Sequence, residues 1–299
     1  DDNTLQISID APKVYFLAKM TYPTAYVLDQ EVVEEGGRNW WVARPVGTGP
    51  FTLKEYRIGE RIVLERFDDY YGDPAMIDKV EMNLGGGQSM AMYENDEIDI
   101  TGVSLFDIEK LLDPSEPLNS DLVVVPPSFS ISYIGFNTTP IWNGEPNPLS
   151  DSKFRQALNH AIDKDLIASD VYYDLIKPSP GVLPPGLPGH NENLEGLGYD
   201  PDLATRLLSE SRFADPNIRP RITVTIPGTG GTIGLYLEVI RDMWKQIEVY
   251  VDIQQVEWAT YLEDLDNNKL QAYAGLGWEA DYPDPQDFLD ILFHSESSL

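Results

Sequence analysis

The sequence predicts an α/β protein with two lobes built on mixed β-sheets. Two kinds of segment follow each other along the chain. In one kind apolar and polar residues alternate, as in strands, and in the other apolar residues recur at helical spacing. One pair of strand segments flanks a short turn, which is typical of an antiparallel hairpin. The length of 299 residues suits about two domains, and the 42% of hydrophobic residues can fill their cores.

The first part of the chain is expected to be rich in strands. Residues 4–10 alternate as a strand does in the middle of a domain. Residues 51–55 and 62–65 flank Gly59-Glu60 and predict a hairpin. Its expected inward residues are Phe51, Leu53, Ile62 and Leu64. The further elements expected in this part are a strand at 79–83, a helix at 88–95 after three glycines, and a strand at 98–100.

Pro126-Pro127 is the predicted boundary between the lobes. The two prolines interrupt the chain just before a new apolar run, which predicts a strand at 130–137. We therefore expect a first lobe over residues 1–126 with a mixed sheet and the hairpin, a hinge near the prolines, and a second α/β lobe over residues 127–299.

The second lobe is expected to alternate helices and strands. A helix capped by Asp151 or Ser152 presents one apolar stripe, and Asp200-Pro201 begins another with an acidic cap followed by proline. Residues 178–190 contain five prolines and predict an ordered loop. The remaining expected elements are strands at 221–226 and 249–253 and helices at 233–247, 258–267 and 286–293.

Composition excludes several classes of function. The chain has 21 Lys+Arg and 50 Asp+Glu, a net charge of −29 that would repel nucleic acid and anionic headgroups. It has no Cys, hence neither a disulfide framework nor a cysteine nucleophile, and 3 His that lack metal-ligand spacing. We expect no cofactor and no metal. No apolar run is long enough to span a membrane, and no leader begins at Asp1.

Glycine-rich turns and acidic clusters carry no catalytic signature. The turn at 45–50 leads into a strand and lacks a following lysine, and Gly85-Gly86-Gly87 has no nearby cation. Acidic clusters such as Asp68-Asp69 lack the ligand spacing of a calcium loop, and no nucleophile elbow occurs. We therefore expect no enzyme activity. The distant alternative is a glycosidase with two paired carboxylates.

Residues 277–285 are the candidate ligand site. They follow a short apolar strand expected to end at Leu276, and open α/β sheets bind ligands at the carboxyl ends of strands. Trp278 and Tyr282 offer aromatic faces, and Asp281 offers a carboxylate that would attract an ammonium group. Asp284 is expected to cap the following helix with Pro285 at its first position, which leaves Asp281 without an expected structural role.

Several segments, in order, resemble one family: the peptide-type (family 5) extracellular solute-binding proteins of ABC importers. They span nearly the whole chain, although each motif alone is weak. The matching segments are 45–51 (PVGTGPF), 66–71 (RFDDYY), 95–99 (NDEID), 153–163 (KFRQALNHAID), 184–186 (PPG) and 277–285 (GWEADYPDP).

The resemblance implies a periplasmic-binding-protein-like (class II type) clamshell that captures di- or oligopeptides between two lobes and delivers them to a membrane-embedded permease. It implies an extracellular or periplasmic protein, held at the membrane through the permease, with a lipid anchor outside this chain as a further expectation. A monomer is expected, but the sequence does not determine the oligomeric state. By the match to peptide-binding relatives, Asp281 pairs with the peptide ammonium and Trp278 packs beside it. The other expected ligand-binding residues are Gly277, Tyr282 and Tyr133, with Phe136 less favoured because its strand parity is opposite.

The chain departs from the family in two respects. Family members are longer at both ends, so we expect a fragment that is incomplete at both ends. No basic residue is marked as partner of a peptide carboxylate. The alternative ligands are an oligosaccharide, for which the aromatic residues offer stacking surfaces, and a nickel chelate or another small solute.

Overall fold

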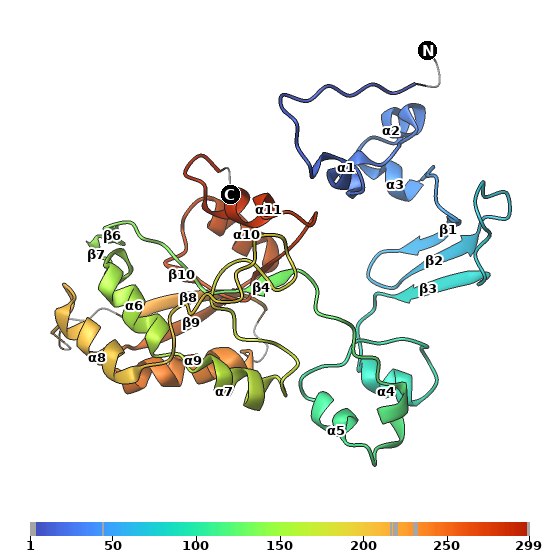
Figure 1. Cartoon of the computed structure of the whole chain (residues 1–299). Coiled ribbons are helices and arrows are strands. Elements are labelled where there is room, and N and C mark those ends of the chain that lie inside the picture. The colour runs from blue at the N-terminus through green and yellow to red at the C-terminus, as the bar shows by residue number, and fades with distance from the viewer. Residues whose placement is uncertain (1–3, 44, 216, 218–220, 230–232, 298–299) are drawn as a thin grey trace. The chain divides into compact units, whose positions relative to one another are not determined.

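A computed structural model describes residues 4–43, 45–215, 217, 221–229 and 233–297 (Figure 1). Contacts between Cα atoms divide the chain into two units, Asp1–Ser120 and Asp121–Leu299. The division lies a few residues before the boundary predicted at Pro126-Pro127. Each unit has its own helices and sheet.

The first unit combines short helices with one three-stranded sheet. The sheet order is β1-β2-β3, and both strand pairs are antiparallel. The helices and strands are α1 (Phe16–Lys19), α2 (Gln30–Gly36), α3 (Trp40–Ala43), β1 (Phe51–Arg57), β2 (Arg61–Arg66), β3 (Lys79–Asn83), α4 (Ser89–Glu94) and α5 (Ile108–Leu112).

The predicted hairpin is confirmed. β1 and β2 pair in antiparallel register around a turn in which Gly59 takes φ +72° and Glu60 N–H donates to the Arg57 carbonyl at 3.0 Å. The sheet is antiparallel and not mixed as expected, because β3 follows β2 without a crossover helix. Phe51, Leu53, Ile62 and Leu64 are only half-buried, and Val63 on the other face is the most buried at 6% exposure.

Two strands predicted for the first unit do not form. Residues 4–10 and 98–100 are irregular, and Leu5 and Ile100 are 83% and 88% exposed. An alternating pattern specifies which face of a strand is apolar, but a strand also needs a neighbour for its backbone N–H and C=O groups. Within the described residues, neither segment is paired with another strand.

The second unit holds a mixed four-stranded sheet. Its order is β5-β10-β8-β9: β10 and β9 run parallel to β8, and β5 runs antiparallel to β10. Two small antiparallel pairs, β11-β4 and β6-β7, accompany it. The strands are β4 (Ser130–Ser132), β5 (Gly135–Phe136), β6 (Ile141–Trp142), β7 (Glu145–Pro146), β8 (Ile222–Pro227), β9 (Val251–Val256), β10 (Ala272–Tyr273) and β11 (Gly277–Glu279).

The helices of the second unit are close to their predicted positions. The helices that begin at Ser152 and Pro201 also have the caps predicted from the sequence; Asp200, for example, accepts the Leu203 N–H at 2.8 Å and precedes Pro201. The predicted helices are α6 (Ser152–His160), α8 (Pro201–Glu210), α9 (Leu235–Gln246), α10 (Trp258–Asp266) and α11 (Gln286–Phe293). The short α7 (Lys164–Leu166) was not predicted.

The main hydrophobic core lies between the four-stranded sheet and helices α6, α8 and α9 (Figure 1). Phe154, Leu158 and Trp244 are fully buried in it together with Val224 of the central strand β8. β8 has buried residues on both faces, as expected for a strand covered on both sides. This core fixes the carboxyl end of β10, from which the chain leads toward residues 277–285.

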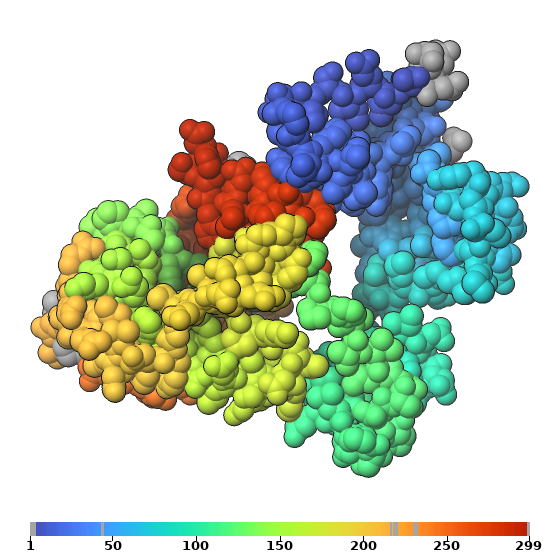
Figure 2. Space-filling view, in the orientation of Figure 1, coloured from blue at the N-terminus to red at the C-terminus, as the bar shows by residue number. Residues whose placement is uncertain are grey.

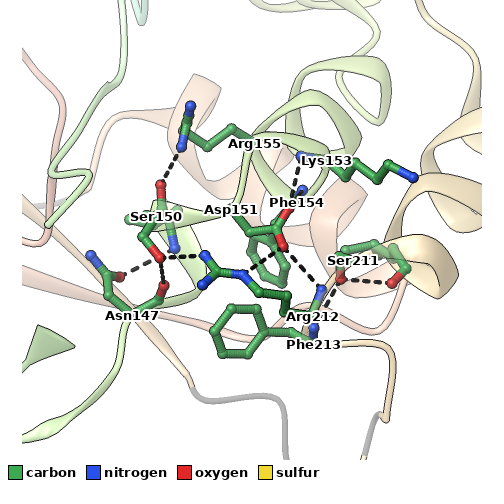
Figure 3. A network of polar contacts seen from close by, with 11 residues as sticks. Asn147, Ser150, Asp151, Lys153, Phe154, Arg155, Ser211, Arg212 and Phe213 are labelled. Atoms are coloured by element: carbon green, nitrogen blue, oxygen red, sulfur yellow. Dashed lines mark hydrogen bonds and ion pairs between the residues drawn. The ribbon is translucent and has the colours of Figure 1, made fainter. Parts of the chain in front are cut away.

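Asp151 connects helix α6 to the end of α8. Its Oδ1 accepts the Lys153 N–H at 2.9 Å, and its Oδ2 accepts the Arg212 backbone N–H at 3.0 Å and the Arg212 Nε–H at 3.2 Å (Figure 3). The Asp151 side chain is only 10% exposed. Burial alone would raise the pKa of Asp151, but the amide and guanidinium groups of Arg212 outweigh it and hold the pKa below its usual value.

Removing this carboxylate is expected to destabilise the second unit in a pH-dependent way. We expect Asp151→Ala to cost about 1–2 kcal/mol for the lost cap alone. Asp151→Asn keeps the oxygen that caps α6 but replaces Oδ2 with an amide nitrogen, so it loses the ion pair and both hydrogen bonds from Arg212. Because the folded-state pKa is lowered, the ionic contribution is present above pH ~4 and fades as pH falls below that value. Urea unfolding of both variants at pH 7 and pH 3 measures this; a wild-type advantage over Asp151→Asn that grows in acid would contradict it.

Candidate ligand-binding site

The segment 277–285 is reached by a switch between sheets. The apolar strand expected over 272–276 ends at Tyr273, because Gly275 takes φ +79° and lies against Pro227, where a Cβ would come within 3.0 Å of Pro227 Cδ. The chain then forms β11, whose Trp278 pairs with Ile131 of β4. Trp278 therefore lies in a second strand and not in a loop after the first.

The predicted strand 130–137 is likewise divided between two sheets. β4 pairs with β11, and β5 pairs with β10, so Tyr133 and Ile134 connect the two strands. Phe136 packs against the main hydrophobic core. The Tyr133 ring meets the Tyr273 ring edge to face at a centroid distance of 6.3 Å. Tyr133 and Phe136 thus have different environments, because Tyr133 lies in the connection between the two strands and Phe136 lies in β5.

Gly277 is required by the close approach of β11 to β4. A Cβ at this position would lie 2.3 Å from the Ile131 carbonyl oxygen, which is a backbone atom and cannot rotate away. Gly277 pairs with Ser132 in the two-stranded ladder. The glycine therefore allows the ladder that presents Trp278 and Asp281 to solvent.

Gly277→Ala is expected to break the β4-β11 ladder. The added methyl group forces the strands apart, with a cost of about 1–3 kcal/mol as for other overpacked sites. Amide hydrogen exchange of Trp278 and Ala280, whose N–H groups face the neighbouring strand, should accelerate, while exchange in α9 stays unchanged. Gly102→Ala is the matched control, because a Cβ there meets no atom within 4 Å. Unchanged protection of Trp278 in Gly277→Ala would rule out the steric requirement.

Trp278 and Asp281 lie on one pocket of about 450 Å³. The Asp281 side chain is exposed and the Trp278 side chain is half-buried. The rest of the wall comes from α11 and the residues that follow it: Asp290, Ile291, His294, Glu296 and Ser297. Three carboxylates thus face the pocket beside an aromatic ring, an environment that favours a cation over an anion.

A residue in the first turn of α11 accepts hydrogen bonds from the two pocket residues Trp278 and Asp281. Asp287 is fully buried, and its Oδ2 accepts the Asp281 backbone N–H at 2.8 Å and the Trp278 Nε1–H at 3.4 Å. Asp284 accepts the Gln286 N–H at 2.9 Å, as a capping residue does. Helix α11 begins at Gln286, so Pro285 occupies the position before the helix and not the expected first helical position.

Tyr282 is buried at 6% exposure, and its hydroxyl donates to the Gln286 side-chain oxygen. It is not among the residues that line the pocket.

Burial raises the pKa of the Tyr133 and Tyr273 phenols. These phenols therefore remain neutral at physiological pH and contribute apolar surface and neutral hydroxyls.

The proline-rich loop 178–190 borders the same segment. A Cβ on Gly189 would be in contact with Pro285 at 3.4 Å, and one on Gly186 would lie 3.2 Å from the Phe129 ring (Figure 2, yellow beside red). Phe129 in turn accepts the Ala280 N–H at 2.8 Å. His190 anchors the loop through Nδ1, 2.7 Å from the Leu183 carbonyl. The described residues contain no group of three or more His, Asp or Glu side chains placed to hold a metal ion.

Comparison with known proteins decides the family. Residues 1–298 match the profile described as bacterial extracellular solute-binding proteins, family 5 Middle. The chain belongs to the family 5 solute-binding proteins. The resemblance read from the sequence motifs is confirmed, and so is the α/β fold of this family of periplasmic binding proteins.

Peptide-binding proteins are prominent among the relatives of this family 5 chain. It is 27% identical to the dipeptide-binding protein of Escherichia coli K12, over 100% of the chain and 55% of that protein. A 28% identical relative is heme-binding protein A of Haemophilus influenzae, matched over 99% of the chain and 54% of that protein. The chain thus spans about half the length of the curated relatives it matches.

Solved structures agree with this assignment. The ABC transporter-associated periplasmic binding protein DppA of Helicobacter pylori, in complex with the peptide STSA, matches with a TM-score of 0.73 and 26% identity, over 94% of the family 5 chain and 53% of that protein. A periplasmic oligopeptide-binding protein of Borrelia burgdorferi matches with a TM-score of 0.76 and 26% identity, over 94% and 55% of the two chains. Across the described residues, every helix is too short or too polar to cross a lipid bilayer.

The candidate site of this family 5 chain includes residues that the sequence motifs do not mark. Asp287 was expected only as part of a helix, and Asp290, His294 and Glu296 had no assigned role. The available signal for Asp287 was an acidic residue in the first helical turn directly after 277–285. Its contacts with Trp278 and Asp281 depend on how α11 folds back onto β11, which the local pattern does not contain.

Proposed function

We propose that the full-length protein is the extracellular or periplasmic receptor of an ABC importer and that it binds peptides through their free amino ends. The observation that carries this proposal is the presence of the exposed Asp281 and the Trp278 ring on one pocket, in a chain of family 5. The peptide-binding relatives support the ligand class.

Asp281 is the proposed partner of the peptide ammonium group. A carboxylate that is partly withdrawn from water when a ligand covers it binds a cation more strongly than it binds an uncharged group. Trp278 would pack against the first residue of the peptide and keep water from the pair. The proposed role of Asp281 and Trp278 is to bind the ligand without converting it.

The other predicted site residues have supporting roles in this proposal. Gly277 admits the close β4-β11 ladder, and Tyr282 fills the space beneath the segment and bonds to Gln286. Tyr133 would contribute a neutral aromatic edge next to Tyr273. The proposed hinge near Pro126-Pro127 lets the two lobes close on the ligand, and the closed form is presented to a membrane permease.

Ligand identification tests the proposal directly. The full-length protein is purified from rich medium and denatured, and the released small molecules are identified by mass spectrometry. Peptides with free amino ends, absent from the Asp281→Asn variant, are the expected result. Recovery of sugars, haem or nickel chelates in place of peptides would overturn the ligand class. Solution scattering with and without saturating ligand measures closure, and an unchanged radius of gyration with proven binding would refute the hinge.

A further inference from the structure

We propose that Asp287 is a positioning residue that holds both ligand-contacting residues of the site, Asp281 and Trp278. The inference rests on the proposed function, because it assigns Asp287 to the same peptide-ammonium site. Asp287 lies outside the sequence motif at residues 277–285.

Asp287 joins three elements through one oxygen atom. It is the second residue of α11, and its Oδ2 accepts the backbone N–H of Asp281, in the loop after β11, at 2.8 Å. The same oxygen accepts the indole Nε1–H of Trp278, within β11, at 3.4 Å. A single buried group therefore determines where the Asp281 main chain and the Trp278 ring lie relative to each other.

The burial of the Asp287 carboxylate costs free energy of folding. The side chain is 0% exposed, and its Oδ1 has no hydrogen-bond partner among the described residues. An apolar residue would avoid this cost in an ordinary helix-to-strand contact. Here the Oδ2 satisfies two donors that belong to the pocket wall, and the first helical turn favours a negative charge.

Positioning matters here because an ion pair depends steeply on geometry. The bond to the Asp281 N–H fixes the main chain at the residue whose side chain must meet the ligand ammonium. The bond to Trp278 sets the ring against which the ligand packs. Without Asp287 the two N–H donors would have to bond to water, and the loop after β11 would adopt other conformations. Ordering this loop on ligand binding would then cost affinity.

Three variants of the full-length protein test the inference. Asp287→Asn keeps an oxygen acceptor of the same shape, Asp287→Ala removes it, and Asp287→Ser retains a polar side chain too short to reach both donors. Titration calorimetry with trialanine and N-acetyl-trialanine gives the affinities, and circular dichroism confirms that each variant is folded. We expect a loss of about 10- to 100-fold for trialanine in Asp287→Ala and Asp287→Ser, and less than about threefold in Asp287→Asn.

A second measurement does not depend on any peptide. With 5-fluorotryptophan incorporated, the ¹⁹F resonance of Trp278 is assigned by its loss in Trp278→Phe. It should shift in Asp287→Ala and remain near the wild-type position in Asp287→Asn. An unmoved resonance in Asp287→Ala, or equal losses of affinity in the Asn and Ala variants, would overturn the inference.

The two measurements separate the inference from the proposed function. If wild type binds neither probe while the Trp278 resonance shifts as expected, the peptide proposal fails for these probes and the positioning role stands. If wild type binds trialanine and Asp287→Ala binds it within threefold of wild type, the peptide proposal stands and the positioning role is refuted.

Discussion

Asp281→Asn in the full-length protein is expected to lower the affinity for peptides with a free amino end by about 30-fold or more, which corresponds to at least about 2 kcal/mol. The substitution preserves shape and removes the charge. The peptide ammonium would still lose its water on binding, but no carboxylate would compensate it. Titration calorimetry of a free-amino peptide recovered with the wild-type protein measures the loss.

Asp290→Asn is the matched control for this prediction. Asp290 lines the same pocket, and its Oδ2 accepts a hydrogen bond from Gln286 Nε2 at 2.6 Å, which an asparagine oxygen can also accept. If the pocket attracts cations only through its overall negative potential, the two variants lose similar affinity and both losses shrink in salt. If Asp281 makes a direct pair, its loss exceeds that of Asp290→Asn by about tenfold or more.

The acetylated form of the same peptide completes the test. Acetylation removes the ammonium charge from the ligand just as Asp281→Asn removes the carboxylate from the protein. The two changes act on one interaction, so their combined effect should be much smaller than the sum of the separate effects. Additive losses would show that Asp281 and the amino end do not meet, and Asp281 would then belong to the surface and not to the ligand site.

Helices were predictable from the sequence because their signals are local. The cap at Asp151, the Asp200-Pro201 start and the stripe containing Trp244 all lie within one turn or one face of the helix they define. Strands depend on partners far along the chain. Residues 4–10 and 130–137 carry similar alternation, yet the first is irregular and the second is split between β11 and β10 as partners.

The candidate site shows the same division between local and tertiary information. Trp278 and Asp281 could be selected from residue chemistry alone, because an aromatic ring and a carboxylate after a strand suit a cationic ligand. The requirement for glycine at position 277 depends on a tertiary contact, the close approach of β11 to the Ile131 carbonyl. The contacts of Asp287 required the fold of α11 against β11, and its position in a helix gave no hint of its burial.

Trp244→Ala is expected to be the most destabilising single change in the second unit, at about 3–5 kcal/mol. Trp244 is fully buried between α9 and the core. Its Nε1–H donates to the Leu158 carbonyl at 2.8 Å, and this carbonyl belongs to the last turn of α6, where intrahelical partners run out. The alanine variant therefore leaves a cavity and also removes a hydrogen bond between helices.

Trp244→Phe separates these two contributions. Phenylalanine retains most of the apolar volume but cannot donate to Leu158, so it should cost about 1–3 kcal/mol, the penalty of leaving a buried carbonyl without its donor. Trp258→Ala is the control for loss of an indole, because Trp258 is 51% exposed and its ring stacks on Tyr261. Urea midpoints at constant m-value rank the three variants. A shift for Trp244→Ala no larger than that for Trp258→Ala would mean that α9 does not anchor the core, whereas equal shifts for Trp244→Ala and Trp244→Phe would place the anchor in the bond to α6 and not in packing.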